Sequence, residues 1–268
     1  MVIECSSNSL VRISLLLTVL FFALPVSAAM FLYQATELQV QYGRYEIPFT
    51  GSSDSETGFV YTFQHAHSWK YGDTYMFIDY SDLDESGTEL YGEIYPNFSL
   101  GKITGRPVGF WKVKDVGVLL GYNYGRDSGI RKYLPGVRFS WDLPGFTFLN
   151  TDFTLYLDDN KGVNGGGIPK EDDSYMIDVN WAAPFDVGRH SFSIEGHVEY
   201  IGSRDNEFGE KIPHHILAQP QFRYDLGKTW FDKKDKLFVG IEWQYWKNKN
   251  DDRDTDESAP QLLIVWRL

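Results

Sequence analysis

Hydrophobic and polar residues alternate along the chain from residue 36 to its end, and helical periodicity is nearly absent. Segments of about ten residues, the length of a tilted transmembrane strand, recur between turn-like clusters. We place these segments at residues 36–44, 59–69, 74–83, 89–100, 113–125, 132–143, 146–159, 174–185, 189–202, 214–227, 236–249 and 259–268. The pattern predicts an all-β chain that forms a transmembrane antiparallel β-barrel of about 12 strands, an even number as in bacterial outer-membrane barrels.

The two faces of these segments differ in chemistry. One face carries aliphatic residues in its middle and a Tyr or Trp near an end, as in Val239, Ile241 and Trp243. That layout is typical of a lipid-facing band bordered by aromatic girdles, so the opposite, polar face would line the barrel. In the segment 74–83 the outward residues are Met76, Ile78 and Tyr80, and the inward residues are Tyr75, Phe77 and Asp79. This segment therefore predicts a water-filled but ring-rich lumen.

The connections favour a barrel over a β-sandwich, which also alternates. If the N-terminus starts in the periplasm, the connections outside the cell are long and acidic or Gly-rich; they are residues 45–58, 81–88, 158–173, 201–213 and 246–258. Several periplasmic connections are short, at residues 70–73, 144–145 and 186–188. Outer-membrane barrels have this asymmetry. Residues 101–112 and 228–235 are long for periplasmic turns, which leaves open either periplasmic excursions or a wrong strand count.

The composition narrows the class of protein further. Aromatic residues make up 16% of the chain and the formal net charge is −12, yet no long apolar run follows residue 28. Scattered rings without such a run suit strands, where a ring recurs at every second residue. Nucleic acid is not expected as a partner, because phosphate binding needs clustered Lys and Arg and none is visible.

The N-terminus predicts export. Arg12 precedes an apolar run over residues 13–24, and the small-residue pattern Val26-Ser27-Ala28 follows. We therefore assign residues 1–28 to a secretory signal peptide and residues 29–268 to the barrel, in the outer membrane of a Gram-negative bacterium. The apolar run is shorter than the roughly 18 residues of a spanning helix. Cys5 is the only cysteine, so the exported protein would contain no disulfide.

Catalytic and metal sites are not expected. Glu195 and Glu199 lie on one strand face, but roughly 13 Å apart at ~3.3 Å per residue. Glycosidase carboxylates lie only ~5 to 9.5 Å apart. His65 and His67 share a strand face, and His214 is adjacent to a further histidine, but no Cys or carboxylate completes a metal site. We predict no catalytic residues, no metal and no cofactor.

Five stretches of the exported chain carry a family resemblance: HSWKYGDTYMFIDY (67–80), LYGEIYPNFSLGKITG (90–105), YLPGVRFSWDLPGF (133–146), AQPQFRYDLG (218–227) and VGIEWQYWKNK (239–249). In matching order they resemble the Tsx and OmpK family of nucleoside-specific outer-membrane channels. The resemblance implies a monomeric twelve-stranded barrel and passive uptake of nucleosides and deoxynucleosides, with phages and colicins as further partners. Such barrels commonly end in Phe, which the barrel-insertion machinery reads, whereas this chain ends Trp266-Arg267-Leu268.

The candidate substrate contacts are rings and polar groups on the inward face. A nucleoside has a flat base on which rings can stack, and ribose hydroxyls that can donate to carboxylates. The rings are Tyr75, Phe77, Tyr91, Tyr95, Phe148, Tyr156 and Trp246. The polar groups are Asp79, Glu93, Asp152, Asp178, Glu195, Arg223 and Glu242. For any one of them, filling and neutralising the barrel interior is an equal alternative.

Two other functions stay open from the sequence. The first is an outer-membrane barrel whose long acidic loops serve adhesion, or phage and colicin attachment, with little conduction. The second is a secreted soluble all-β enzyme or lectin. For the leading hypothesis, the partners would be nucleosides as substrates, outer-membrane lipids and the barrel-insertion machinery.

Overall fold

The structure, a computed structural model, describes residues 31–50 and 54–268; the predicted signal peptide lies outside the described residues. The strands are β1 (Phe31–Glu46), β2 (Ser55–Trp69), β3 (Gly72–Leu83), β4 (Gly87–Ser99), β5 (Val113–Gly125), β6 (Arg131–Trp141), β7 (Phe148–Asp158), β8 (Ser174–Val187), β9 (His190–Ile201), β10 (Arg204–Asp205), β11 (Lys211–Ile212), β12 (His215–Ala218), β13 (Gln221–Asp225), β14 (Leu237–Lys247) and β15 (Glu257–Arg267). The helices are α2 (Leu100–Thr104), α3 (Leu226–Phe231), and the 3-10 turns η1 (Val163–Gly165) and η2 (Lys249–Asp251).

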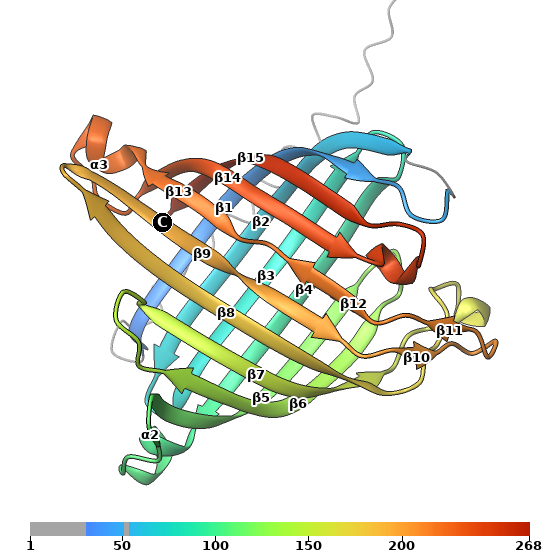
Figure 1. Cartoon of the computed structure of the whole chain (residues 1–268), viewed down its shortest axis with the longest axis horizontal. Helices are drawn as coiled ribbons and strands as arrows, with labels where there is room; N and C mark the ends of the chain where they lie inside the picture. Colours follow the sequence, from blue (N-terminus) through green and yellow to red (C-terminus); the bar gives the residue numbers. More distant parts are fainter. Residues whose placement is uncertain (1–30, 51–53) are drawn as a thin grey trace, which may run out of the picture.

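All strands except β10 and β11, which pair with each other, form one closed antiparallel barrel, seen side-on in Figure 1. From β1 to β9 each strand pairs with the next, and β14 pairs with β15. The barrel closes where β1 pairs with β15, with Leu38 opposite Trp266. Closure gives every barrel strand two neighbours and leaves no open sheet edge. The predicted twelve-stranded barrel is confirmed, because β12 and β13 together occupy one strand position between β9 and β14.

The interruption between β12 and β13 has a local cause. Pro220 has no backbone N–H to give to a neighbouring strand. Opposite it, Gly196 has a φ of 142°, and a Cβ there would lie 2.3 Å from the carbonyl oxygen of Gln219. The ladder continues across this bulge, since Gln219 N donates to His197 O (3.0 Å) and Trp243 N donates to Pro220 O (2.9 Å). The strand bends here without opening the barrel wall.

The outward face is the apolar one that the alternation predicts. Leu262 and Trp243 are 67% and 55% exposed, whereas their chain neighbours Gln261 and Glu242 are 2% and 4% exposed. Successive strand residues point to opposite sides of a sheet, so the exposed side chains cover the outside and the buried polar ones the inside. The molecule therefore has an apolar exterior around a polar interior.

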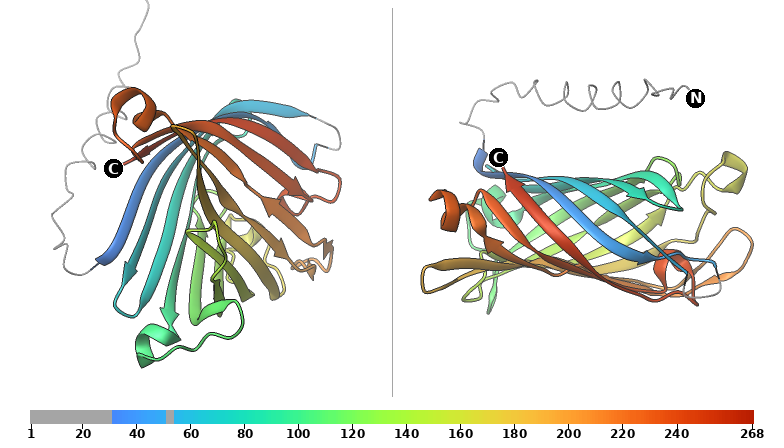
Figure 2. Two further views of the ribbon diagram at one scale, coloured as in Figure 1. Left: turned by 60° about the vertical axis from the view of Figure 1, so that its left-hand side comes forward. Right: turned by 90° about the horizontal axis from the view of Figure 1, so that it is seen from above.

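The two ends of the barrel are built differently. The N-terminal end of β1, the C-terminal end of β15, α2 and α3 lie at one end, which we call the terminal end (Figures 1 and 2). The connections with η1, η2 and the β10–β11 ribbon lie at the other, the loop end. The long connections 101–112 and 228–235 overlap or adjoin α2 and α3, so they are excursions and the strand count stands. No helix in the described ranges is long and apolar enough to cross a membrane.

One predicted loop is wrong. Residues 81–88 were expected to form a long connection at the loop end, but β3 continues to Leu83 and β4 begins at Gly87. Only residues 84–86 connect the strands. Gly87 takes a φ of 78°, which a side chain rarely adopts, and this permits the tight turn. Acidic and polar composition alone did not distinguish a protruding strand end from a loop.

Candidate functional site

One cavity of about 2230 Å³ occupies the barrel interior. Its lining includes Arg106 and Lys234 from the terminal end, and Lys211 and Asn250 from the loop end, so the same cavity reaches both. The inward residues predicted from the sequence all line it: Tyr75, Phe77, Asp79, Tyr91, Glu93, Tyr95, Phe148, Asp152, Tyr156, Asp178, Glu195, Arg223, Glu242 and Trp246. The alternation of residues along each strand thus correctly predicted that these side chains point into the lumen.

A run of rings lies on the inward face of β3 and β4. The ring centroids of Tyr75 and Phe77 are 6.1 Å apart, and those of Phe77 and Tyr91 are also 6.1 Å apart. Tyr95 lies opposite Tyr75 in the β3–β4 register. The hydroxyl of Tyr75 donates to Gln64 Oε1 (3.1 Å), which fixes its ring against the wall. The run offers a flat solute several faces on which to stack.

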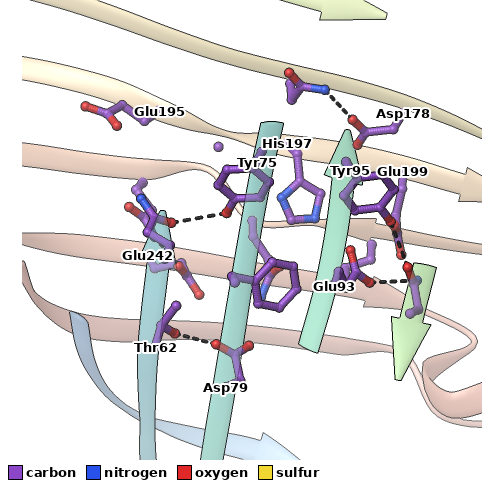
Figure 3. A pocket seen from close by; sticks show the side chains of 18 of the residues that line it. Thr62, Tyr75, Asp79, Glu93, Tyr95, Asp178, Glu195, His197, Glu199 and Glu242 are labelled. Atoms are coloured by element: carbon purple, nitrogen blue, oxygen red, sulfur yellow. Dashed lines mark hydrogen bonds between the residues drawn. The ribbon is translucent and has the colours of Figure 1, made fainter. Parts of the chain in front are cut away.

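Four carboxylates around these rings form no ion pair with any described residue: Asp79, Glu93, Asp178 and Glu199. Figure 3 shows their side chains gathered around Tyr75, Tyr95 and His197. Three of the four accept hydrogen bonds, all from neutral donors, and Glu199 accepts from no described residue. Thr62 Oγ1 donates to Asp79 Oδ1 (2.6 Å), and Asn180 Nδ2 donates to Asp178 Oδ2 (2.6 Å). We call this group the mid-lumen cluster.

Glu93 has the most donors in the mid-lumen cluster. The hydroxyl of Tyr91 donates to Glu93 Oε1 at 2.5 Å, and Asn123 Nδ2 donates to the same oxygen at 2.8 Å. Asn123 in turn accepts from the hydroxyl of Tyr95 (3.1 Å). Tyrosine and asparagine donors hold this carboxyl group in a defined orientation, and no described Lys or Arg pairs with it. The middle of the lumen is therefore rich in acceptors and rings.

Other predicted contacts are ion-paired on the terminal side of the lumen. Arg223 forms ion pairs with Glu37 and Glu195, each at 3.1 Å, and Arg267 reaches Glu37 at 2.6 Å. Glu242 forms no ion pair with a described residue and accepts a hydrogen bond from the neutral amide of Gln221, Nε2 to Oε2 at 2.5 Å. The arginine and glutamate side chains of the group neutralise and brace one another across strands that are far apart in sequence.

A second ion-paired group joins β3, β6 and β7. Arg138 donates two parallel hydrogen bonds to Asp152, from Nε to Oδ1 (2.8 Å) and from Nη2 to Oδ2 (2.7 Å). Its third contact is to Asp73 at 3.0 Å. Both oxygens of Asp152 are thus occupied by a two-pronged partner, the strong geometry for a guanidinium and a carboxylate. Asp152 lines the cavity, but its acceptors are already engaged by the wall.

The loop end contains an ion-paired group that the sequence did not predict. Glu171 Oε2 accepts from Lys132 Nζ and from Arg204 Nε, both at 2.5 Å, and Arg204 Nη2 reaches Asp251 Oδ1 at 2.9 Å. Lys132 and Arg204 lie over the ring of Tyr156, at 4.9 and 5.4 Å from its centroid. The group links three loop-end connections to β6 and β7. Loop conformation brings these residues together, and alternation carries no signal for that.

Two of the predicted rings lie against lysine or arginine side chains near the loop end. Tyr156 lies beneath the cations just described, and Trp246 lies 6.0 Å from Lys249 Nζ. Lys249 also forms an ion pair with Glu257 at 2.5 Å. Both rings contact protein cations, and Tyr156 also packs in one buried cluster with Tyr95. Phe148 lies at the start of β7, and 40% of its surface is exposed.

Two of the histidines considered as metal ligands have ordinary partners. His65 Nδ1 lies 2.8 Å from Thr36 Oγ1, and the ring of His214 stacks on that of Tyr200 at 5.5 Å. In the part of the chain that the structure describes, no group of three or more His, Cys, Asp or Glu side chains could hold a metal ion. Glu195 pairs with Arg223, whereas Glu199 does not, so the two glutamates occupy unlike environments.

The comparisons with known proteins place the fold. No protein-family model and no curated protein matches the sequence. Among solved structures, the NanC porin has a TM-score of 0.52 and 12% identity, covering 86% of this chain and 100% of that one. The KdgM porin gives 0.45 and 10%, covering 85% and 98%, and the translocator domain of the autotransporter NalP from Neisseria meningitidis gives 0.44 and 9%, covering 97% and 98%. This protein is a closed twelve-stranded antiparallel β-barrel that is similar in fold to the NanC porin.

Proposed function

We propose that the protein is an outer-membrane channel for the passive, selective diffusion of nucleosides and deoxynucleosides. The observation that supports a channel is the cavity of about 2230 Å³ inside the closed barrel, which is lined by residues from both ends. The exposed apolar exterior fits a lipid environment, in which a barrel satisfies every backbone polar group internally. The predicted signal peptide and the resemblance to the Tsx and OmpK family support export to the outer membrane as a monomer.

The mid-lumen cluster supports the nucleoside part of the proposal. Stacking of a base on an aromatic side chain contributes ~1 to 3 kcal/mol and does not depend on the base. The rings of Tyr75, Phe77 and Tyr91 offer such faces. The neighbouring carboxylates of Asp79 and Glu199 have acceptor capacity for ribose hydroxyls. Several weak contacts of this kind allow a solute both to enter and to leave.

The two ends support an orientation. Long connections of outer-membrane barrels lie outside the cell, so the loop end would face the exterior and the terminal end the periplasm. Phe49 and Phe208 are 70% and 62% exposed at the loop end. Exposed rings on outer loops favour a second role, as an attachment surface for a phage or colicin, which is compatible with conduction.

Conductance in a planar lipid bilayer tests the channel. The folded protein should give single-channel currents that thymidine and adenosine reduce at millimolar concentration or below, because a bound nucleoside obstructs ions. Ribose alone and an uncharged disaccharide serve as solute controls. Nucleosides that leave the current unchanged, while the other solutes pass freely, would overturn the nucleoside proposal and leave a general channel.

A further inference from the structure

A groove of about 530 Å³ lies on the outside of the barrel at the terminal end, separate from the lumen. It is lined by Gly227, Phe231, Lys233, Lys236, Leu237 and Trp266. These residues come from α3, from the segment after it, and from the paired ends of β14 and β15. Figure 1 shows α3 standing beyond the strand ends, beside the C-terminus. The groove therefore lies where the apolar exterior ends.

One half of the groove is apolar and faces outward. Trp266 is 53% exposed and Phe231 is 58% exposed. Leu237 lies opposite Trp266 in the β14–β15 register. Their chain neighbours Val265 and Phe238 are 0% and 4% exposed and pack inside the barrel. Because strand residues alternate, Trp266 and Leu237 continue the outward apolar band down to the terminal rim.

The other half of the groove is cationic. Lys233 and Lys236 are exposed, and neither forms an ion pair with a described residue. The connecting segment from residue 226 to residue 236 holds four lysines against two aspartates, and neither aspartate lines the groove. Backbone bonds fix the segment at two points: Lys233 N donates to Gly227 O (3.0 Å), and Arg267 N donates to Lys236 O (2.9 Å). Two unpaired ammonium groups are thus held on a defined backbone beside apolar surface.

The other long connection at this end repeats the composition. Trp111 and Phe110 are 87% and 59% exposed, and Lys112 and Arg106 flank them. Aromatic side chains prefer the headgroup level of a bilayer, and lysines there extend toward lipid phosphates. The terminal rim as a whole therefore matches a membrane–water interface with anionic headgroups.

We propose that the groove binds an anionic phospholipid from the leaflet at the terminal end. The phosphate would lie between the ammonium groups of Lys233 and Lys236, and an acyl chain would lie along Trp266 and Leu237. Each lysine near an anionic membrane surface contributes about 1 kcal/mol to the binding free energy. Two lysines therefore raise the affinity roughly 30-fold. The inference rests on the membrane setting of the proposed function, and is independent of what crosses the lumen.

Native mass spectrometry of the folded full chain in detergent tests the groove. The protein would be titrated with phosphatidylglycerol, with zwitterionic phosphatidylethanolamine of the same acyl chains, and with lipopolysaccharide. The test variant is K233Q/K236Q. The matched control is K234Q, which removes a lysine from the same segment that lines the lumen and not the groove. Heat-modifiable gel mobility checks that each variant is folded.

We expect a phosphatidylglycerol adduct that resists collisional removal, about 30-fold weaker in K233Q/K236Q and unchanged in K234Q. Equal adducts with the zwitterionic lipid, stronger adducts with lipopolysaccharide, or equal losses in both variants would each overturn the proposal. Nucleoside reduction of the current, measured on the same preparations, should be the same for the native protein and K233Q/K236Q. A failure of nucleoside binding would therefore be visible separately from a failure of lipid binding.

Discussion

The lumen contains carboxylates of two kinds. In the first kind, Asp152 and Glu171 accept from buried arginine or lysine side chains at 2.5 to 2.8 Å. In the second kind, Asp79 and Asp178 accept only from neutral Thr and Asn donors, and Glu199 accepts from no described residue. The two kinds can lie side by side, since Asp178 is directly opposite Asp152 in the β7–β8 register. A carboxylate whose oxygens are occupied by a guanidinium is part of the wall. One with an unoccupied oxygen beside aromatic rings remains available to a solute.

The comparison implies that similar residue types have different roles. Removing one partner of a buried ion pair leaves an uncompensated charge and costs about 3 to 5 kcal/mol. Removing a mid-lumen side chain leaves no such charge behind, so its effect should fall on solute binding. The ion-paired carboxylates would thus set the stability and shape of the lumen, and the unpaired carboxylates would set which solutes pass.

The largest expected effect is on stability, at the loop end. Glu171→Ala removes the carboxylate that Lys132 and Arg204 share, where all three side chains are at most 3% exposed. Lys132 keeps Asp158 and Arg204 keeps Asp251, so we expect a loss of about 3 kcal/mol, at the lower end for a broken buried pair. The temperature at which the folded band disappears in gels should fall, and single-channel conductance should rise as the connections loosen.

Asp172→Ala is the control for that variant. Asp172 is the exposed chain neighbour of Glu171, and its side chain forms no ion pair with a described residue. It should leave both the unfolding temperature and the conductance unchanged. If Glu171→Ala behaves like Asp172→Ala, the loop-end group does not hold the connections in place.

The next effect is the acid sensitivity of the loop end. Burial raises the pKa of Asp251, but its hydrogen bond with His215 and the charge of Arg204 outweigh burial and lower the pKa to about 2. Because the folded-state pKa lies below the unfolded value of ~3.9, Asp251 contributes stability that is fully present above about pH 4. That contribution is lost as the pH falls from about 4 to about 2.

Unfolding temperatures of the native protein and Asp251→Asn, measured at pH values from 6 to 2, check this. The variant should be less stable than the native protein at pH 6, and the difference should shrink to near zero at pH 2. Asp254→Asn, at an exposed aspartate three residues away, corrects for general acid effects. A difference that stays constant across the range would show that Asp251 does not stabilise the folded loop end through its charge.

The third effect is on solute binding in the middle. Phe77→Ala removes the central ring of the run and should weaken nucleoside binding about tenfold, ~1.4 kcal/mol, without lowering the unfolding temperature appreciably. The adenosine concentration that halves the current measures it. Phe153→Ala is the control, because Phe153 is 47% exposed on the outward face. Equal half-blocking concentrations for the two variants would remove Phe77 from the solute path.

Much of the barrel wall could be predicted from the sequence, because the face to which a strand residue points depends only on its position along that strand. Alternation placed Tyr75, Phe77 and Asp79 inward and found twelve strand positions, even where Pro220 interrupts one of them. The same signal reached its limit at residues 81–88, where polar residues continue two strands instead of forming a long loop.

The division between paired and unpaired carboxylates could not be predicted. Glu171 lies 39 residues from Lys132 and 33 from Arg204, and Glu37 lies 186 residues from Arg223. Such pairs depend on which strands become neighbours on closing the barrel and on how the loops fold inward. The alternation along a strand predicts that a side chain points into the lumen, but it does not predict whether a Lys or Arg side chain will lie beside it.

The smallest effect tests that division directly. In Asp79, Oδ1 accepts from Thr62 and Oδ2 accepts from no described residue, whereas Arg138 occupies both oxygens of Asp152. Asp79→Asn keeps the shape but replaces one carboxyl oxygen by an amide NH2 group, so one acceptor for ribose hydroxyls is lost. We expect nucleoside binding about threefold weaker and an unchanged unfolding temperature. Asp152→Asn should do the reverse, lowering the unfolding temperature while leaving the half-blocking adenosine concentration within error. If both variants change the unfolding temperature, or both change the half-blocking adenosine concentration, then paired and unpaired carboxylates do not have separate roles in stability and in solute binding.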